Sequence, residues 1–381
     1  MNGAAALPRA RKFVRPVIEF EHKNPVLCIA ALAALVTSVI VPPDAEYLGY
    51  FDFKTLTCLF CVLAVVCALK NIRFFYLLAK KIVSLCRNLR MSVLSLVVIT
   101  FVGSMLIAND MALLTFLPLG YFVLKETGKE KYMAFTFIMQ NIAANLGGML
   151  TPFGNPQNLY LYSHFAIPDG EFVSIMLPSF LLSVTLIAVC CLFLPAEPLT
   201  MPKSDDAPLP KKRTAAYLAL FALSILIVFR SVPYLVGLIV IPAALLFLDK
   251  KALAAVDYPL LLTFVCFFIF SGNLSRVGAV NDLVSGLLNK STLVVGTLSC
   301  QFISNVPSAI LLSRFTSNYR DLLVAVNIGG VGTLISSLAS LITFREYTSH
   351  NPGRTKAYLL RFSAFSFGFL AILLVFNLIL L

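Results

Sequence analysis

The stretch GGMLTPFGNPQNLYLY (147–162) interrupts one of the longest apolar runs in this chain of 381 residues. It contains three glycines, two prolines and three side-chain amides, but no charged side chain. The surrounding uncharged run, 132–168, is too long for one straight helical crossing of a hydrocarbon core of about 30 Å. A helix that breaks inside a bilayer leaves backbone N–H and C=O groups that protein, water or ligand must satisfy. The stretch therefore predicts a broken membrane helix over 132–163.

The remainder of the chain is also strongly apolar. Hydrophobic residues make up 59% of the sequence and charged residues only 13%, and long uncharged runs recur along it. These features predict an all-α polytopic membrane protein. The apolar segments contain no paired aspartates, no Ser/His pair and no set of metal ligands, so an enzyme is not expected.

The formal net charge of +12 follows the membrane pattern rather than a nucleic-acid-binding pattern. Basic residues concentrate in 9–23, 70–90 and 345–361, next to hydrophobic spans, as the positive-inside rule requires. We therefore expect an integral protein of the plasma (inner) membrane that binds no nucleic acid. Segment 1–25 is predicted to be cytoplasmic, and the C-terminus is predicted to lie outside.

The distribution of apolar runs and charges predicts about nine transmembrane helices, two re-entrant hairpins and two broken helices. A linker rich in proline and charge, 197–213, separates a first half (26–196) from a second half (214–381). The hairpins are predicted at 91–124 and 292–317, and the broken helices at 132–163 and 322–343. Segments 70–90 and 277–289 are predicted to be interfacial.

The two halves resemble each other in sequence. NLGGMLTPFGNPQNL (145–159) aligns with NIGGVGTLISSLASL (327–341), and IANDMALLTFLP (107–118) aligns with ISNVPSAILLSR (303–314). A third pair is FDFKTLTCLFC (51–61) and VDYPLLLTFVC (256–266). On the predicted topology five spans separate the two hairpin tips, and an odd number inserts the halves in opposite orientations. This is an inverted-topology repeat, whose binding site is expected at the repeat interface.

Two hairpin tips and two helix breaks at one place would form a binding site for ions. Free helix N-termini suit an anion, whereas unwound carbonyls with Asn, Ser and Thr oxygens suit Na⁺. The candidate substrate- and ion-binding residues are Asn109, Asp110, Asn145, Gly147, Gly148, Thr151, Asn155, Gln157, Asn158, Ser304, Asn305, Ser308, Asn327, Gly329, Gly330, Thr333, Ser336 and Ser337. The Na⁺ candidates among them are Asn109, Asp110, Gly147, Asn305 and Gly329.

Each group of candidates also has a purely structural interpretation. Asp110 could cap the second hairpin helix, although an intramembrane carboxylate is a functional candidate by default. The paired glycines could only pack helices together. Asn155, Gln157 and Asn158 could hold the ligand or satisfy their own broken backbone, and the sequence leaves this open.

These motifs resemble the ion-transporter superfamily of divalent anion/sodium symporters, citrate permeases, arsenite permeases and NhaD-type antiporters. SMLIANDMALLTFLP (104–118) and TPFGNPQNLYLY (151–162) are similar to first-half signatures of the citrate/arsenite branch. SNVPSA (304–309) and GGVGTLISSLAS (329–340) look like the second-half pair. The resemblance implies a homodimer, an elevator motion, and hairpin tips that contact substrate carboxylate and Na⁺. The second tip has Val306 where the symporter motif Ser-Asn-Thr has Thr.

The leading hypothesis is a secondary active transporter of a small anion, such as a di- or tricarboxylate. It would use Na⁺ or H⁺ as the coupling ion, need no organic cofactor, and have the lipid bilayer and a second copy of itself as its partners. The alternative is a Na⁺/H⁺ antiporter or an arsenite-type efflux permease on the same fold, with Asp110 as the titrating group.

Overall fold

The computed structural model describes residues 24–199 and 208–380, and within them helices are joined by short connections without a β-strand. The prediction of an all-α polytopic membrane protein is confirmed. The prediction for segment 1–25 falls almost wholly outside the described residues, as does the middle of the 197–213 linker.

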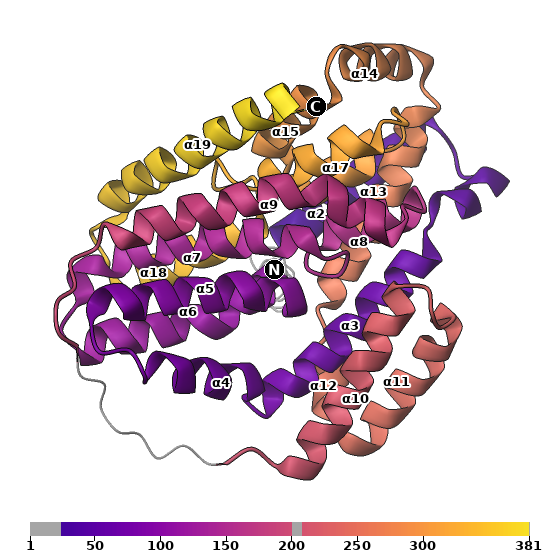
Figure 1. Ribbon diagram of the computed structural model, residues 1–381. Helices are drawn as coiled ribbons and strands as arrows, with labels where there is room; N and C mark the ends of the chain where they lie inside the picture. The colour runs from indigo at the N-terminus through magenta and orange to yellow at the C-terminus, as the bar shows by residue number, and fades with distance from the viewer. Residues whose placement is uncertain (1–23, 200–207, 381) are drawn as a thin grey trace, which may run out of the picture.

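One group of helices, which we call the lateral bundle, includes the two helices that are capped by the aspartate of the repeated Asp–aromatic motif. Asp52 accepts a hydrogen bond from the backbone N–H of Thr55 at the start of α3, and Asp257 does the same for Leu260 at the start of α13. In Figure 1, α3, α10 and α11 slant together at the lower right. The lateral bundle consists of α2 (Pro25–Ile40), α3 (Phe53–Asn71), α10 (Lys211–Val228), α11 (Tyr234–Leu248), α12 (Lys250–Ala254) and α13 (Tyr258–Ser275).

A second group, which we call the hairpin bundle, contains both predicted hairpins and both predicted helix breaks. Its first-half members are α5 (Leu89–Ile107), α6 (Asn109–Glu126), α7 (Met133–Gly147), α8 (Pro156–His164) and α9 (Asp169–Leu192). Its second-half members are α15 (Thr292–Ile303), α16 (Asn305–Leu312), α17 (Tyr319–Ile328), α18 (Leu338–His350) and α19 (Thr355–Leu380). The broken helices pass each other at the centre, since α7 packs on α18 and α8 packs on α17.

Shorter helices lie in the connections within and between these groups. They are the 3₁₀ helices η1 (Ala45–Tyr50), η2 (Glu130–Tyr132) and η3 (Gly148–Leu150), and the helices α4 (Phe74–Val83) and α14 (Gly278–Lys290). Figure 1 shows α4 leading from the lateral bundle to the hairpin bundle, and α14 at the opposite end of the molecule. Both lie in segments predicted to be interfacial.

Five of the described helices are long and apolar enough to cross a bilayer, namely α3, α5, α9, α13 and α19. A sixth crossing is reached if α14 and α15, which meet at 118°, are counted as one bent span. The predicted number of nine counts α5 with the first hairpin rather than as a span, and adds to the other four the shorter apolar helices α2 and α11, α10, and the two broken helices. It therefore stays a prediction.

Candidate functional site

The two hairpin tips have the same unusual backbone. Ala108 has φ 66° and ψ 153°, and Ser304 has φ 74° and ψ 159°, a conformation that costs L-residues of order 1–3 kcal/mol. In each tip the following asparagine, Asn109 or Asn305, accepts a hydrogen bond of 2.9 Å from the next backbone N–H through its side-chain oxygen. The sequence similarity of the two tips therefore extends to their conformation.

Each helix break is tied to its own hairpin by a threonine. Thr151 donates to the carbonyl of Met105 at 2.8 Å, and Thr333 donates to the carbonyl of Gln301 at 3.0 Å. The two accepting residues both lie four positions before the tip asparagine. Each hairpin and its break are thus held as one unit.

Gln301 strengthens this connection in the second half and was missed by the sequence reasoning. Its side-chain nitrogen donates to the carbonyl of Gly329 at 2.8 Å, and its oxygen accepts from the N–H of Thr333 at 2.9 Å. A lone glutamine in an apolar hairpin helix was the signal that could have identified it.

Five of the six predicted asparagines meet in one buried network that joins the two halves. Asn109 donates to the side-chain oxygen of Asn145 at 3.3 Å. Asn155 donates to the Asn145 carbonyl at 3.4 Å and to the Asn327 side chain at 3.3 Å, and Asn327 donates to Asn158 at 2.6 Å. All five are at most 4% exposed. The breaks of the two halves therefore bind each other through side-chain amides.

Asn158 shows how part of the broken backbone is satisfied. Its side-chain nitrogen lies 3.1 Å from the carbonyl oxygen of Gly148 and 3.3 Å from those of Met149 and Thr151. In the second break, hydroxyls perform this role, since Ser336 donates to the carbonyl of Gly330 at 2.9 Å. These contacts favour the structural interpretation for this amide.

Two of the paired glycines are required by the close approach of the network. A Cβ on Gly148 would lie 2.4 Å from the side-chain oxygen of Asn155, and one on Gly330 would lie 2.9 Å from the side-chain nitrogen of Asn305. Their neighbours Gly147 and Gly329 instead face the hairpin helices, where a Cβ would lie 2.3 Å from the Phe101 carbonyl oxygen and 2.9 Å from Cys300.

Several predicted site residues lie outside the amide network. Ser308 shares a hydrogen bond of 2.6 Å with Ser299 inside the second hairpin, and Ser337 caps α18 by accepting from the N–H of Ser340. Gln157 is buried, and its side-chain oxygen has no hydrogen-bond partner among the described residues. Asn305 also lies outside it, and its backbone N–H donates to the carbonyl of Ser336 at 2.9 Å. Asp110 lines a cavity between the two bundles.

That cavity, of about 70 Å³, lies between the two bundles and is lined by the starts of three helices of the hairpin bundle. Its lining includes Asp110 near the start of α6, Pro156 at the start of α8 and Leu338 at the start of α18. Helix N-termini carry partial positive charge and stabilise anions nearby.

The same cavity contains a second carboxylate, that of Asp257, which the sequence reasoning did not select. The repeated motif VDYPLLLTFVC was the only signal for it. One oxygen of Asp110 is buried without a partner in the described structure, and the other lining residues are apolar apart from Asp257. The cavity thus joins helix dipoles suited to an anion with two acids suited to a cation or proton.

Two arginines contact η1 and the residue before it, on the predicted exterior side. Arg276 contacts Asp44 at 2.7 Å, Glu46 at 3.3 Å and the Tyr50 hydroxyl at 3.0 Å, and this guanidinium lowers the pKa of Asp44. Arg314, beyond the end of α16, donates to the Tyr50 carbonyl at 2.7 Å. Arg276 is thereby paired with acids of the loop that is predicted to lie outside.

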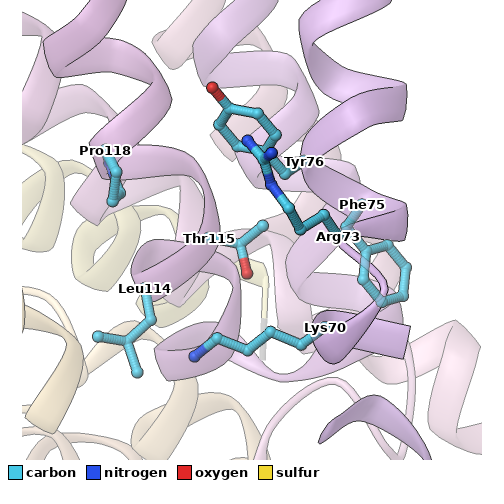
Figure 2. A pocket seen from close by; sticks show the side chains of 7 residues that line it. All are labelled: Lys70, Arg73, Phe75, Tyr76, Leu114, Thr115 and Pro118. Atoms are coloured by element: carbon cyan, nitrogen blue, oxygen red, sulfur yellow. The ribbon is translucent and has the colours of Figure 1, made fainter. Parts of the chain in front are cut away.

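The contacts between the bundles are asymmetric with respect to the repeat. The lateral helix α3 packs on α8, and its counterpart α13 packs on α16. The equivalent pairs, α13 with α18 and α3 with α6, make at most marginal contact. A cavity of about 300 Å³ lies where α3 and α6 are apart (Figure 2).

Comparison with known proteins assigns this arrangement to transporters. A family model described as "Citrate transporter" matches residues 20–319. An uncharacterized transporter of Methanocaldococcus jannaschii is 31% identical over 312 residues, which cover 82% of this chain and 85% of that protein. The inner membrane protein YbiR of Escherichia coli is 30% identical over 282 residues, covering 71% of this chain and 74% of that protein.

A solved structure supports the same fold. The crystal structure of the YdaH transporter of Alcanivorax borkumensis, described as having an unusual topology, superposes with a TM-score of 0.51. The match covers 87% of both chains at 14% sequence identity, so the likeness concerns the fold alone.

Proposed function

Because this chain belongs to the citrate transporter family, we propose that it carries a small multivalent anion, such as a di- or tricarboxylate, by secondary active transport coupled to Na⁺ or H⁺. The relatives are described as a transporter and as an inner membrane protein, and the protein is a membrane transporter rather than an enzyme. The substrate, the coupling ion and the mechanism are the proposed parts.

The observation that carries the proposal is the convergence of three helix N-termini on the cavity between the bundles. The first turns of α6, α8 and α18 contribute Asp110, Pro156 and Leu338 to one wall. Each N-terminus has backbone N–H groups without helical acceptors, and such groups bind carboxylates well. Uncharged donors of this kind bind an anion without a permanent counter-charge. The empty carrier therefore has no buried net charge from these donors when it returns to its starting conformation.

Coupling follows from the two acids that line this cavity. Asp110 and Asp257 repel an anion unless a proton or a cation neutralises them, so the anion and the cation or proton favour each other's binding. This coupling is reciprocal, as any linkage between two ligands must be. Na⁺ would be held by main-chain carbonyls, amides and hydroxyls at the tips together with Asp110.

The amide network serves as the frame of this site. Asn155, Asn158 and Asn327 are occupied with each other and with broken backbone, so we assign them to preorganisation. The groups that face the substrate are the main chain of the tips and the helix starts, together with Asp110. Preorganised dipoles of this type need no rearrangement when the ligand arrives.

For alternating access we propose an elevator motion of the hairpin bundle along the lateral bundle, in a homodimer with inverted repeats. The asymmetric packing supports it, since one symmetry-related pair of interfaces is closed while the other is apart. Exchanging the two sets of contacts would move the hairpin tips toward the other side of the membrane.

A second candidate function is a Na⁺/H⁺ antiporter or an arsenite-type efflux permease. The observation in its favour is that both ionisable side chains lining the Asp110 cavity are acidic. Such a lining could bind a cation or proton without any anionic partner.

The test is uptake by purified protein in liposomes of neutral lipid. Labelled citrate, succinate and sulfate are offered under an imposed Na⁺ gradient, an imposed pH gradient, or neither. Gradient-driven accumulation of a carboxylate supports the anion transporter. Na⁺/H⁺ exchange or arsenite efflux in the same vesicles, without carboxylate uptake, overturns it in favour of the second candidate.

A further inference from the structure

A cavity of about 400 Å³, which we call the Arg314 cavity, lies between the two bundles on the predicted exterior side. One side is lined by the end of η1, the start of α3 and Tyr234 at the start of α11. The other side is lined by the C-terminal part of α8 and by Arg314, beyond the end of α16. The cavity shares no lining residue with the Asp110 cavity, and its volume is in the range of small-molecule sites, about 300–1,000 Å³. A molecule bound in it would contact both bundles.

The guanidinium of Arg314 is only partly paired. Its Nη2 atom donates to the carbonyl of Tyr50 at 2.7 Å, and its guanidinium carbon lies 6.0 Å from the centre of the Tyr50 ring. Within the described residues, neither Nε nor Nη1 has a hydrogen-bond partner, and no acid forms an ion pair with the group. Nε is buried and Nη1 is not, so the N–H groups of Nη1 are available to a ligand.

Lys54 is a second base at this cavity, in a position that its own helix disfavours. It lies in the first turn of α3, where the partial positive charge of the helix N-terminus opposes a cation. It forms no ion pair in the described part of the chain. A lysine in this place is therefore better explained by a ligand in the cavity than by the stability of α3.

Asp52 is the one carboxylate that lines the cavity within the described structure, and both of its oxygens are occupied. One accepts from the backbone N–H of Thr55 at 2.9 Å, and the other accepts from the Thr55 hydroxyl at 2.6 Å. The lining thus contains two bases, Lys54 and Arg314, and one acid that is engaged in capping α3. A concave surface with more positive than negative charge attracts anions.

A simpler interpretation is that Arg314 only fastens the bundles together through the Tyr50 carbonyl. That interpretation accounts for Nη2, but not for the accessible Nη1 or for the presence of Lys54 at the same cavity. The internal repeat does not require these bases either, since the aligned counterparts of Lys54 and Arg314 are Pro259 and Pro118. The pair of bases is therefore particular to the predicted exterior side.

We propose that the Arg314 cavity binds a small oxyanion, with a carboxylate or phosphate group, through Nη1 of Arg314 and the ammonium of Lys54. Hydrogen bonds from such cations to an oxyanion are charge-assisted and stronger than bonds between neutral groups. The further assignment of this anion as the transported substrate, bound on the predicted exterior side, rests on the proposed function. An anionic lipid headgroup has the same chemistry, so the two sources are separated by experiment.

The test uses a single fluorophore in the wall of the cavity. The chain contains no tryptophan, so Tyr234→Trp adds one emitter among the lining residues. The matched control is Phe247→Trp in the last turn of the same helix, where Phe247 is 92% exposed and does not line the cavity. The emission of the full-length protein in phosphatidylcholine nanodiscs is titrated with citrate, succinate or inorganic phosphate, against NaCl of the same ionic strength. A second arm replaces part of the neutral lipid with phosphatidylglycerol.

A saturable change in emission is expected for Tyr234→Trp and not for Phe247→Trp. In the Tyr234→Trp background, Lys54→Gln and Arg314→Gln should each raise the half-saturating anion concentration at least about fivefold, because each removes a charge-assisted bond. Arg320→Gln, which removes an exposed base on the same predicted side outside the cavity, should leave that concentration unchanged. A change caused by phosphatidylglycerol but by no soluble anion assigns the site to a lipid headgroup.

The proposal is overturned if no probe changes the Tyr234→Trp emission beyond the effect of NaCl. It is also overturned if the half-saturating concentration stays the same in Lys54→Gln or in folded Arg314→Gln. Should Arg314→Gln fail to fold because the bundles lose a contact, Lys54→Gln decides, since Lys54 has no ion pair to lose within the described residues.

This readout is independent of transport. If no carboxylate is taken up by liposomes but the emission change depends on Lys54, the proposed function fails and the anion site stands. If a carboxylate is taken up but no probe changes the emission, the function stands and the site is refuted.

Discussion

Replacing Asn158 with alanine decides whether the amides of the first break hold the backbone or the ligand. In the structure the Asn158 side-chain nitrogen faces three carbonyls of the break, and its oxygen accepts from Asn327 at 2.6 Å. We expect Asn158→Ala to destabilise the protein while leaving the half-saturating substrate concentration of the folded fraction within about twofold. The reason is that every observed contact of this amide is internal.

The magnitude follows from the number of bonds lost. One NH₂ group makes two hydrogen bonds at a time and the oxygen makes a third, so the variant loses about three. Polar contacts within membrane proteins average about 0.6 kcal/mol each, which gives a lower value of about 2 kcal/mol. Leaving a buried partner unsatisfied costs about 1–3 kcal/mol, although water entering the space vacated by the side chain limits the sum. We therefore expect a loss of about 2–4 kcal/mol in the free energy of unfolding.

The assay is reversible unfolding in mixed detergent–SDS micelles, combined with uptake by the refolded protein in liposomes. The matched control is Asn377→Ala. Asn377 is also a buried membrane amide, but it bonds to Ser179 and Leu373, away from both breaks. It should cost less, about 1–2 kcal/mol, because fewer groups lose a partner. Wild-type stability of Asn158→Ala together with a tenfold higher half-saturating concentration would refute the reasoning and make this amide a ligand contact.

Three further predictions follow from the site and its surroundings. Asp110→Asn should reduce gradient-driven uptake at least tenfold with a change in unfolding free energy below about 1 kcal/mol, because the buried Asp110 oxygen has no partner to lose; wild-type ion dependence in this variant would contradict its role. Gly148→Ala should destabilise by about 1–3 kcal/mol, since its Cβ would lie 2.7 Å from the Gly154 carbonyl oxygen, whereas Gly286→Ala, with nothing within 4 Å, should be neutral or slightly stabilising in the same unfolding assay. Contacts with basic and phenolic groups lower the pKa of Glu197 from 4.5 to about 2. The ionised Glu197 therefore stabilises the folded state above pH 4.5, and this stabilisation is lost as the pH falls toward 2. A Glu197→Gln variant whose unfolding has the same acid sensitivity as that of the wild type would exclude this contribution.

The broken helices show how far local sequence predicts this fold. The long uncharged runs and the glycines, prolines and amides inside one of them place a helix break, because a bilayer leaves few other structures available. In the structure α7 ends at Gly147, α8 begins at Pro156, and the second break spans the aligned residues. The two hairpin tips also lie at the aligned positions. Ala108 and Ser304, the residues between the two helices of each hairpin, share one backbone conformation.

The partners of the polar side chains could not be predicted in the same way. Asn155 was an equal candidate for ligand and for backbone, and the structure shows it bonded to Asn145 and Asn327. Gln301 and Asp257 were missed because a single polar residue in an apolar segment does not reveal which distant groups it will face.

The sequence is sufficient to identify a helical membrane protein with two related halves. Hydrophobic length, charge position and helix-breaking residues have their effects within one segment or through the bilayer, so they can be interpreted without knowing the tertiary contacts. The three-dimensional arrangement was needed to show that Asp110 and Asp257 line one cavity, that the amides bind one another, and that α3 is apart from α6 whereas α13 packs on α16. Those outcomes depend on the relative position of two helix bundles. The contacts that set this position join residues far apart in the chain, and the local sequence pattern does not specify such contacts.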